Sequence, residues 1–187
     1  MRRHESLLAQ LQGYAPDDRV EAGHRAAMLN LLTSAGDPFS RVHFQPGHFT
    51  ASCYIIDDAA RLLLHHHRRL NRWLQMGGHV EPDEAPAVAA LREGREESGL
   101  TDLELVGELF DLDIHPIPAG KGEPDHHHFD VRYLARTASP ESIVIDAAES
   151  NELAWVTLDR AEELMNAPES SRVIRKIERM LAHRSVS

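Results

Sequence analysis

Apolar residues recur at helical spacing near both ends of the chain. Leu7, Leu8 and Leu11 predict a short helix over residues 4–12. A second helix is expected to begin after Pro16-Asp17-Asp18, which is a good start signal, and to end at Gly36. Toward the C-terminus, a helix is expected from Asp159, and an amphipathic helix is marked by Val173, Ile174, Ile177 and Leu181.

Between these helices, β-branched and aromatic runs predict strands over residues 48–57, 61–67, 109–115, 126–133, 143–146 and 153–157. The first two flank a turn at Asp57-Asp58 and should pair as a hairpin. A helix follows, with Pro86 in its first turn and Gly99 closing it. The chain therefore runs from a hairpin, through a loop that contains Gly77 and Gly78, into a helix.

The strands at 109–115 and 126–133 alternate strongly between apolar and polar residues. Phe110, Leu112 and Ile114 share one face of the first strand. If the two strands pair, their polar faces together carry Asp111, Asp113, His115, His126, His128, Asp130 and Arg132. Histidine and aspartate are not favoured in strands. This face therefore either lines a substrate pocket, is an ordinary solvated surface, or holds a separate histidine–carboxylate metal site.

Three glutamates crowd one side of the helix that begins at Pro86. Glu93, Glu96 and Glu97 lie at i, i+3 and i+4, so they span roughly 100° of the helix surface. Like charges this close destabilise a helix, and such a run is either a solvated face or a site for a divalent cation. Arg92 lies four residues before Glu96 and can hold its carboxylate in position.

The same helix has an apolar side that should face a sheet. Val88 and Leu91 point away from the glutamates and are expected to pack on the strands. Gly94 interrupts the helix, where glycine costs about 1 kcal/mol relative to alanine. We expect Gly94 to leave a gap in the packing of the helix.

The full spacing of this region resembles the Nudix box, the signature of the Nudix hydrolase family. Gly78 is followed after five residues by Glu84, and after seven more by Arg92-Glu93; Glu96-Glu97 and Gly99-Leu100 then complete the pattern. Two positions depart from it. Gly94 stands where the family has a bulky apolar residue, and Met76 stands where proline is common.

The resemblance implies an α/β/α sandwich with a mixed β-sheet, here with an N-terminal helical extension and a C-terminal helix. We expect a single domain over residues 1–187, with the extension at 1–42, the core at 43–160 and the helix at 161–187. It also implies hydrolysis of a pyrophosphate bond in a nucleoside diphosphate linked to another group, such as ADP-ribose or a nucleotide sugar. Mg²⁺ or Mn²⁺ would be the cofactor, because such ions neutralise phosphate charge and activate water.

Site residues follow from the resemblance position by position. Glu93, Glu97 and Arg92 are the expected catalytic residues, and Glu84 is expected to support the loop. The expected metal ligands are Gly78, through its carbonyl, with Glu93, Glu96 and Glu97. The general base stays open between Glu93, Glu123 and His128. From the strand pattern and the hairpin, the predicted substrate-binding residues are Arg68, His115, His126, His128, Asp130 and Arg132. The 116–125 loop is expected to act as a flap over them.

Charge and cysteine content narrow the alternatives. A formal charge of −10 over 187 residues argues against stable binding to nucleic acid, but not against a small nucleotide-type substrate. Cys53 is the only cysteine, and no stretch is apolar enough for a signal peptide or a membrane span, so a cytoplasmic protein is expected. The N-terminal helices would suit a homodimer contact. Two alternatives are an inactive nucleotide-binding or regulatory Nudix module and an isomerase, which would need a reactive Cys53.

Overall fold

A computed structural model describes residues 3–120 and 122–184 of the chain. Two helices come first, α1 (Arg3–Gly13) and α2 (Arg19–Leu32), and Asp18 caps α2 by accepting a hydrogen bond from the Glu21 amide. The remaining helices are α3 (Pro86–Ser98), α4 (Leu158–Met165) and α5 (Ser170–Arg184), with a short 3₁₀ turn at Pro140–Ser142. The strands are β1 (Gly47–Ile56), β2 (Leu62–His67), β3 (Arg72–Leu74), β4 (Met76–His79), β5 (Glu104–Ile117), β6 (His126–Arg136) and β7 (Ser150–Val156).

The strands form one mixed seven-stranded sheet in the order β3-β2-β1-β6-β5. β1 and β6 are parallel over ten residue pairs, and β5 and β6 pair antiparallel. β1 shares its other edge between two partners, because β4 pairs with its middle residues and β2 with its last two. β7 pairs with β2. The long parallel pair at the centre fixes which side chains share each face.

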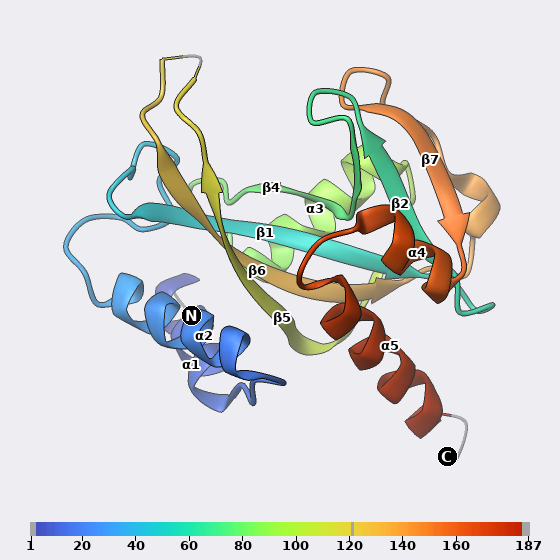
Figure 1. Ribbon diagram of the computed structural model, residues 1–187, viewed down its shortest axis with the longest axis horizontal. Helices are drawn as coiled ribbons and strands as arrows, with labels where there is room; N and C mark the ends of the chain where they lie inside the picture. The colour runs from blue at the N-terminus through green and yellow to red at the C-terminus, as the bar shows by residue number, and fades with distance from the viewer. Residues whose placement is uncertain (1–2, 121, 185–187) are drawn as a thin grey trace.

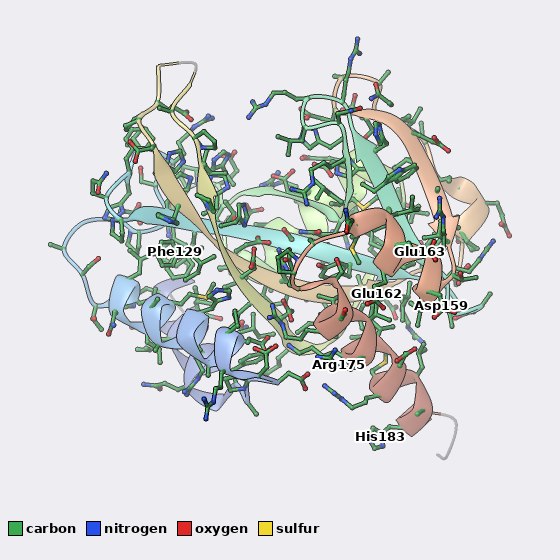
Figure 2. The ribbon with its side chains drawn as sticks, in the orientation of Figure 1. Phe129, Asp159, Glu162, Glu163, Arg175 and His183 are labelled. Atoms are coloured by element: carbon green, nitrogen blue, oxygen red, sulfur yellow. The ribbon has the colours of Figure 1, made fainter. Side chains whose placement is uncertain are left out.

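Helices cover both faces of the sheet, which gives the expected α/β/α sandwich (Figure 1). One core lies between the sheet, α3 and the N-terminal helices, and it includes Leu11 and Met28 from the helices and Phe129 from β6 (Figure 2). A second core lies under α4 and α5, where Tyr54 of β1 meets Ile177 of α5. β1 contributes to both cores because successive side chains point to opposite faces.

Several details differ from the prediction. The two glycines at 77 and 78 lie in β4, an extended edge paired with β1, and not in a loop. Residues 143–146 form no strand, although β7 is present where a strand was expected. A bulge in β5 next to Phe110 moves that ring into the core under α4 and α5, apart from Leu112 and Ile114. These three predictions were wrong for the same reason, because contacts with distant parts of the chain decide which strands pair and where bulges form.

Helix α3 also packs differently from the expectation. Val88 is 56% exposed, whereas Ala89 and Ala90 are fully buried against the sheet, so the prediction for Val88 was wrong. Gly94 leaves no gap. A methyl group there would lie 3.1 Å from Leu103 Cδ1 and 3.4 Å from Cys53 Cβ. The small residues therefore let α3 approach β1 closely, and glycine replaces the bulky residue because no room remains for one.

We expect Gly94→Leu to destabilise the fold by about 1–3 kcal/mol, because its side chain must displace Leu103 or Cys53. Gly94→Ala should stay within about 1 kcal/mol of the parent, since the helix propensity gained offsets the tight contact. Urea unfolding would measure both effects. Val88→Leu, on the exposed side of α3, is the matched control. A Gly94→Leu protein as stable as the parent would contradict the close packing, and Leu103→Ala should partly rescue that variant.

Buried charges fix the N-terminal helices to the sheet. Asp111 of β5 is fully buried, and its carboxylate accepts hydrogen bonds from Arg172 Nε and Lys176 Nζ of α5, both at 2.8 Å. The Lys176 ammonium also donates to Glu21 of α2 and, at 2.7 Å, to the Tyr14 hydroxyl. A buried ion is costly unless it is paired in this way. The N-terminal helices thus belong to the packed body of the protein.

No helix in the described residues has the length and apolar character needed to cross a membrane. The 116–125 connection between β5 and β6 is tied by a bridge between Gly120 and Glu123, and Lys121 of the predicted flap lies outside the described residues.

Candidate active site

A cavity of about 1260 Å³ opens between α3, the sheet and the N-terminal helices. Its walls come from distant parts of the chain, including Phe39 before β1, Glu93 and Glu97 of α3, and His115 at the end of β5. Leu70, Leu74, Ile114, Pro116 and Ile117 add apolar surface. A large site with apolar walls and a few convergent polar groups is typical of a small-molecule site.

Arg92 organises the acidic end of the cavity. Its guanidinium donates to Glu84 Oε1 at 3.1 Å, to Glu93 Oε1 at 2.7 Å and to Glu96 Oε2 at 3.0 Å. A further bond reaches the His79 carbonyl. Glu84 accepts a hydrogen bond from the Glu81 amide as well, so it braces the turn before α3. Arg92 therefore holds three carboxylates in position, and two of them, Glu84 and Glu93, raise the pKa of its guanidinium.

Glu93 and Glu97 are the buried carboxylates of the group. Burial raises the pKa of both, and together with repulsion from Glu93 it raises the pKa of Glu97 to about 8. Oε2 of Glu97 is buried without any hydrogen-bond partner. His65 Nδ1 lies 3.8 Å from it, but burial lowers the pKa of His65 to about 4, so that ring is neutral near pH 7. The backbone of Gly77 stabilises the Glu97 carboxylate through a hydrogen bond, but burial and repulsion outweigh it and the pKa stays raised.

Gly77 and Gly78 of β4 have no room for a side chain, because neighbouring atoms lie close to their backbone. A methyl group on Gly77 would lie 2.8 Å from Ser52 Cα of β1. A methyl group on Gly78 would lie 2.5 Å from Glu93 Oε1. Only glycine lets the backbone pass between the sheet and the α3 carboxylates at this distance. The Gly78 backbone is therefore directly beside the acidic group.

The sheet forms a polar wall of the cavity next to these carboxylates. Asp130 of β6 accepts hydrogen bonds from Thr50 at 3.0 Å, from Ser52 at 2.8 Å and from Arg132 Nε at 2.8 Å. Arg132 is 3% exposed and also donates to Asp113 Oδ2 at 3.0 Å. With its bonds committed to carboxylates, the Arg132 guanidinium positions Asp113 and Asp130 at the wall. Asp113 keeps a pKa below its usual value despite burial, because Arg132 and His115 stabilise the charge.

Histidines gather at the far end of the same sheet face. The ring of His128 has its centroid 4.9 Å from that of His48, 5.4 Å from that of His79 and 5.5 Å from that of His115. His126 lies 5.1 Å from His48. Burial, reinforced by neighbouring histidines, lowers the pKa of His48 to about 4 and that of His128 to about 2. These two rings are neutral near pH 7.

The structure brings most of the predicted site residues together. Around the cavity lie Gly78, Glu93, Glu97, His115, His128, Asp130 and Arg132. Arg92 and Glu96 are bound to Glu93 through the Arg92 guanidinium. Arg68 lies elsewhere and donates to the Ala147 carbonyl, whereas Arg69 and Arg72 line the cavity. His126 is buried behind His128 and is not part of the cavity wall.

Sequence reasoning missed several residues of the site. His65 of β2 contacts Glu97, and His48 and His79 join the histidine cluster from β1 and β4. Their separation along the chain hides them, since β1 and β6 pair across about 80 residues. The only signal was the residue type, because histidine is uncommon at the buried positions of a strand.

Comparisons with known proteins agree with this geometry. The family model described as NUDIX domain matches residues 46–177. A probable DHNTP pyrophosphohydrolase from Lactococcus lactis subsp. cremoris is 35% identical over 168 residues, which are 89% of this chain and 93% of that protein. An isopentenyl-diphosphate delta-isomerase from Streptomyces griseus is 34% identical, over 78% of this chain and 79% of that protein.

Among solved structures, a C. elegans Ap4A hydrolase binary complex has a similar fold, with a TM-score of 0.60 and 23% identity over 72% of this chain and 98% of that one. The family match covers most of the chain, including the strands and the helix that build the acidic end of the cavity. This chain therefore belongs to the Nudix family and is a hydrolase that acts on pyrophosphate bonds.

Proposed function

We propose that the protein is a divalent-metal-dependent hydrolase that cleaves the pyrophosphate of a nucleoside diphosphate linked to a second group. The observation that carries this proposal is the buried, unpartnered Oε2 of Glu97 beside Glu93, at one end of a cavity large enough for a small nucleotide. Desolvated carboxylates of this kind are stable as anions only beside a cation.

The acidic group fits Mg²⁺ or Mn²⁺. Both ions prefer oxygen ligands, and Glu93, Glu96 and Glu97 with the Gly78 carbonyl offer only oxygen. Arg92 keeps the carboxylates of Glu93 and Glu96 apart and oriented. Once bound, the ion would neutralise phosphate charge and make bound water more acidic.

The remaining residues of the site would place the substrate. Arg69 and Arg72 line the cavity and would contact phosphate, while the apolar surface near Ile114 and Phe39 would accept the base or the second group. His115 and His128 would bind the substrate from the sheet. Because water and phosphate would already be positioned here, the reaction would not lose the translational and rotational entropy of bringing them together.

The surroundings of the three candidate general bases distinguish them from one another. A pKa of about 2 makes His128 a weak base near neutral pH, because a proton on that ring is strongly disfavoured. Glu123 pairs with Arg41 at 3.5 Å and is not among the residues that line the cavity. Glu93 lies at the acidic end, bound to Arg92, and its raised pKa suits proton transfer better. We therefore propose Glu93 as the base.

The L. lactis relative supports a second substrate class. That protein is a probable DHNTP pyrophosphohydrolase, and the similarity extends over 89% of this chain. A triphosphate on a heterocycle would use the same acidic end and the same apolar wall. The isomerase reading has less support, because Cys53 is fully buried and its pKa is raised to about 12 by that burial.

A substrate panel tests the proposal. ADP-ribose, nucleotide sugars, dinucleoside polyphosphates, nucleoside triphosphates, DHNTP and isopentenyl diphosphate would be incubated with Mg²⁺, with Mn²⁺ and with EDTA. We expect phosphate-containing products only with metal, identified by ³¹P NMR and mass spectrometry. Turnover of DHNTP alone would favour the second class. Tight nucleotide binding without any turnover would indicate an inactive binding module.

A further inference from the structure

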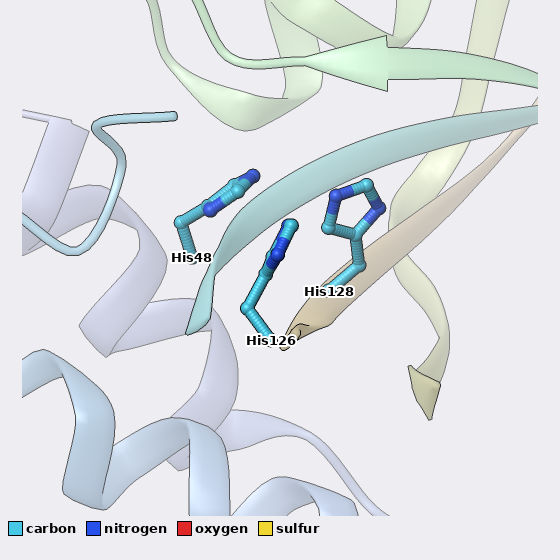
Figure 3. Close-up of side chains that lie close together, drawn as sticks. All are labelled: His48, His126 and His128. Atoms are coloured by element: carbon cyan, nitrogen blue, oxygen red, sulfur yellow. The ribbon is translucent and has the colours of Figure 1, made fainter. Parts of the chain in front are cut away.

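We propose that His48, His126 and His128 form a second metal site, which binds a first-row transition-metal ion such as Zn²⁺ and is separate from the α3 carboxylates. One nitrogen from each ring lies within 4.8 Å of the others, close enough for a shared ion after small side-chain movements. Figure 3 shows the three rings side by side at the start of β1 and β6. The site goes beyond the proposed hydrolysis and does not depend on it.

Strand pairing explains why the three rings converge. β1 and β6 run parallel, and His48 is the direct register partner of His128. His126 precedes His128 by two residues and therefore points to the same face of the sheet. His127 lies between them on the opposite face and is exposed. The arrangement thus follows from the pairing of the first residues of β1 and β6.

Hydrogen bonds leave one nitrogen of each ring free. Nδ1 of His126 lies 2.9 Å from the Pro124 carbonyl, and Nδ1 of His48 lies 3.4 Å from the His43 carbonyl. A carbonyl only accepts, so Nδ1 must carry the proton and Nε2 keeps a lone pair. Histidine ligands of metal ions are commonly oriented by such a bond from their second nitrogen.

Nε2 of His48, which carries the lone pair, is energetically unfavourable when no metal ion is bound. Nε2 is buried and has no hydrogen-bond partner among the described residues. A buried polar atom without a partner costs roughly 1–3 kcal/mol, and native proteins contain few of them. The His128 ring packs against the rings of His48 and His126. A metal ion would satisfy both rings at once.

The ligand chemistry distinguishes this site from the acidic one. Three imidazoles favour Zn²⁺ and similar ions, whereas carboxylates and carbonyls favour Mg²⁺ and Mn²⁺. His79 and His115 pack against His128, and His115 contacts Asp113, but the three-ring group of potential ligands contains imidazoles alone. His128 also lines the cavity. An ion bound here would add positive charge to a wall that neutral rings leave uncharged.

The test measures Zn²⁺ binding by untagged protein that has been stripped with a chelator. In a Glu93→Gln/Glu97→Gln background, which removes the carboxylate site, we expect one Zn²⁺ per chain by calorimetry and elemental analysis. His48→Gln and His128→Gln in that background should weaken binding at least about a hundred-fold. His127→Ala is the matched control and should bind like its parent, because that ring faces away.

If a histidine variant fails to fold, X-ray absorption spectroscopy identifies the zinc ligands in proteins that keep all three histidines. We expect scattering from about three imidazoles in the background variant and in the unmodified chain at one equivalent of Zn²⁺. An all-oxygen ligand shell would overturn the proposal. So would unchanged zinc affinity in a folded His48→Gln protein, or the absence of bound Zn²⁺ in the carboxylate-free background.

Discussion

Replacement of Glu97 by glutamine is expected to lower kcat about a thousand-fold, because the metal interactions it removes are worth several kcal/mol in the transition state. Glu97 contributes a buried Oε2 that accepts no hydrogen bond from the residues that the structure describes, and a cation would satisfy this oxygen. Glutamine keeps the shape of the side chain but offers a neutral amide in place of a carboxylate.

The fold should survive this change. The carboxyl group is buried beside Glu93, and its raised pKa shows that the surroundings disfavour its charge. The neutral amide removes that cost, so the melting temperature of metal-free Glu97→Gln should equal or exceed that of the parent.

Steady-state rates with the best substrate of the panel, at saturating Mg²⁺, would measure the effect. Circular dichroism and thermal unfolding in EDTA would show that the variant is folded. Glu108→Gln, at an exposed position of β5, is the matched control and should turn over normally. Unchanged turnover by folded Glu97→Gln would remove this residue from the metal site.

Replacement of Asp111 by alanine is expected to destabilise the protein by about 3–5 kcal/mol, the usual cost of removing one partner from a buried ion network. Arg172 and Lys176 both bind its carboxylate, and all three groups are buried. Without it, Lys176 and Arg172 share the buried carboxylate of Glu21, and Arg172 keeps one further partner, the more exposed Asp18 at 3.5 Å. For a chain of this size, the melting temperature should fall by roughly 10 °C.

Thermal and urea unfolding would measure this loss. Glu163→Ala removes one partner of an exposed pair on α4, in which Glu163 meets Arg160 at 2.7 Å. Exposed pairs contribute about 0–1 kcal/mol, so this control should be nearly neutral. Equal, small effects for both variants would mean that the Asp111 network does not hold α2 and α5 to the sheet.

Local patterns were sufficient to predict much of the fold. Helix α3 and its left-handed end at Gly99 follow from proline and glycine placement, and the structure confirms both. The alternation around His115 and Asp130 predicted that β5 and β6, if they paired, would share a polar face, and the two strands do pair. The spacing of the glutamates predicted that they would gather on one side of α3. Each of these features depends on residues that are close in sequence or share a simple period.

Features set by distant partners could not be predicted. Nothing near His48 indicates that it lies beside His128, because the parallel pairing of β1 with β6 is a tertiary property. Gly94 seemed to leave a hole, but Leu103 and Cys53 fill that space from other elements. Val88 was assigned to the sheet from helical period alone, and the alanines at 89 and 90 occupy that side. The environment of these residues depends on how closely distant elements pack, and the local sequence does not determine that distance.

The contact between Glu21 and Lys176 has a consequence for synthesis of the protein. The two residues are 155 positions apart, so the anion on α2 gains its cation only after α5 has been translated. Closing so long a loop is entropically costly and comes late in folding. On the ribosome, the N-terminal helices should therefore remain undocked and protease-sensitive while the sheet forms. Their protection should appear abruptly once α5 has left the exit tunnel.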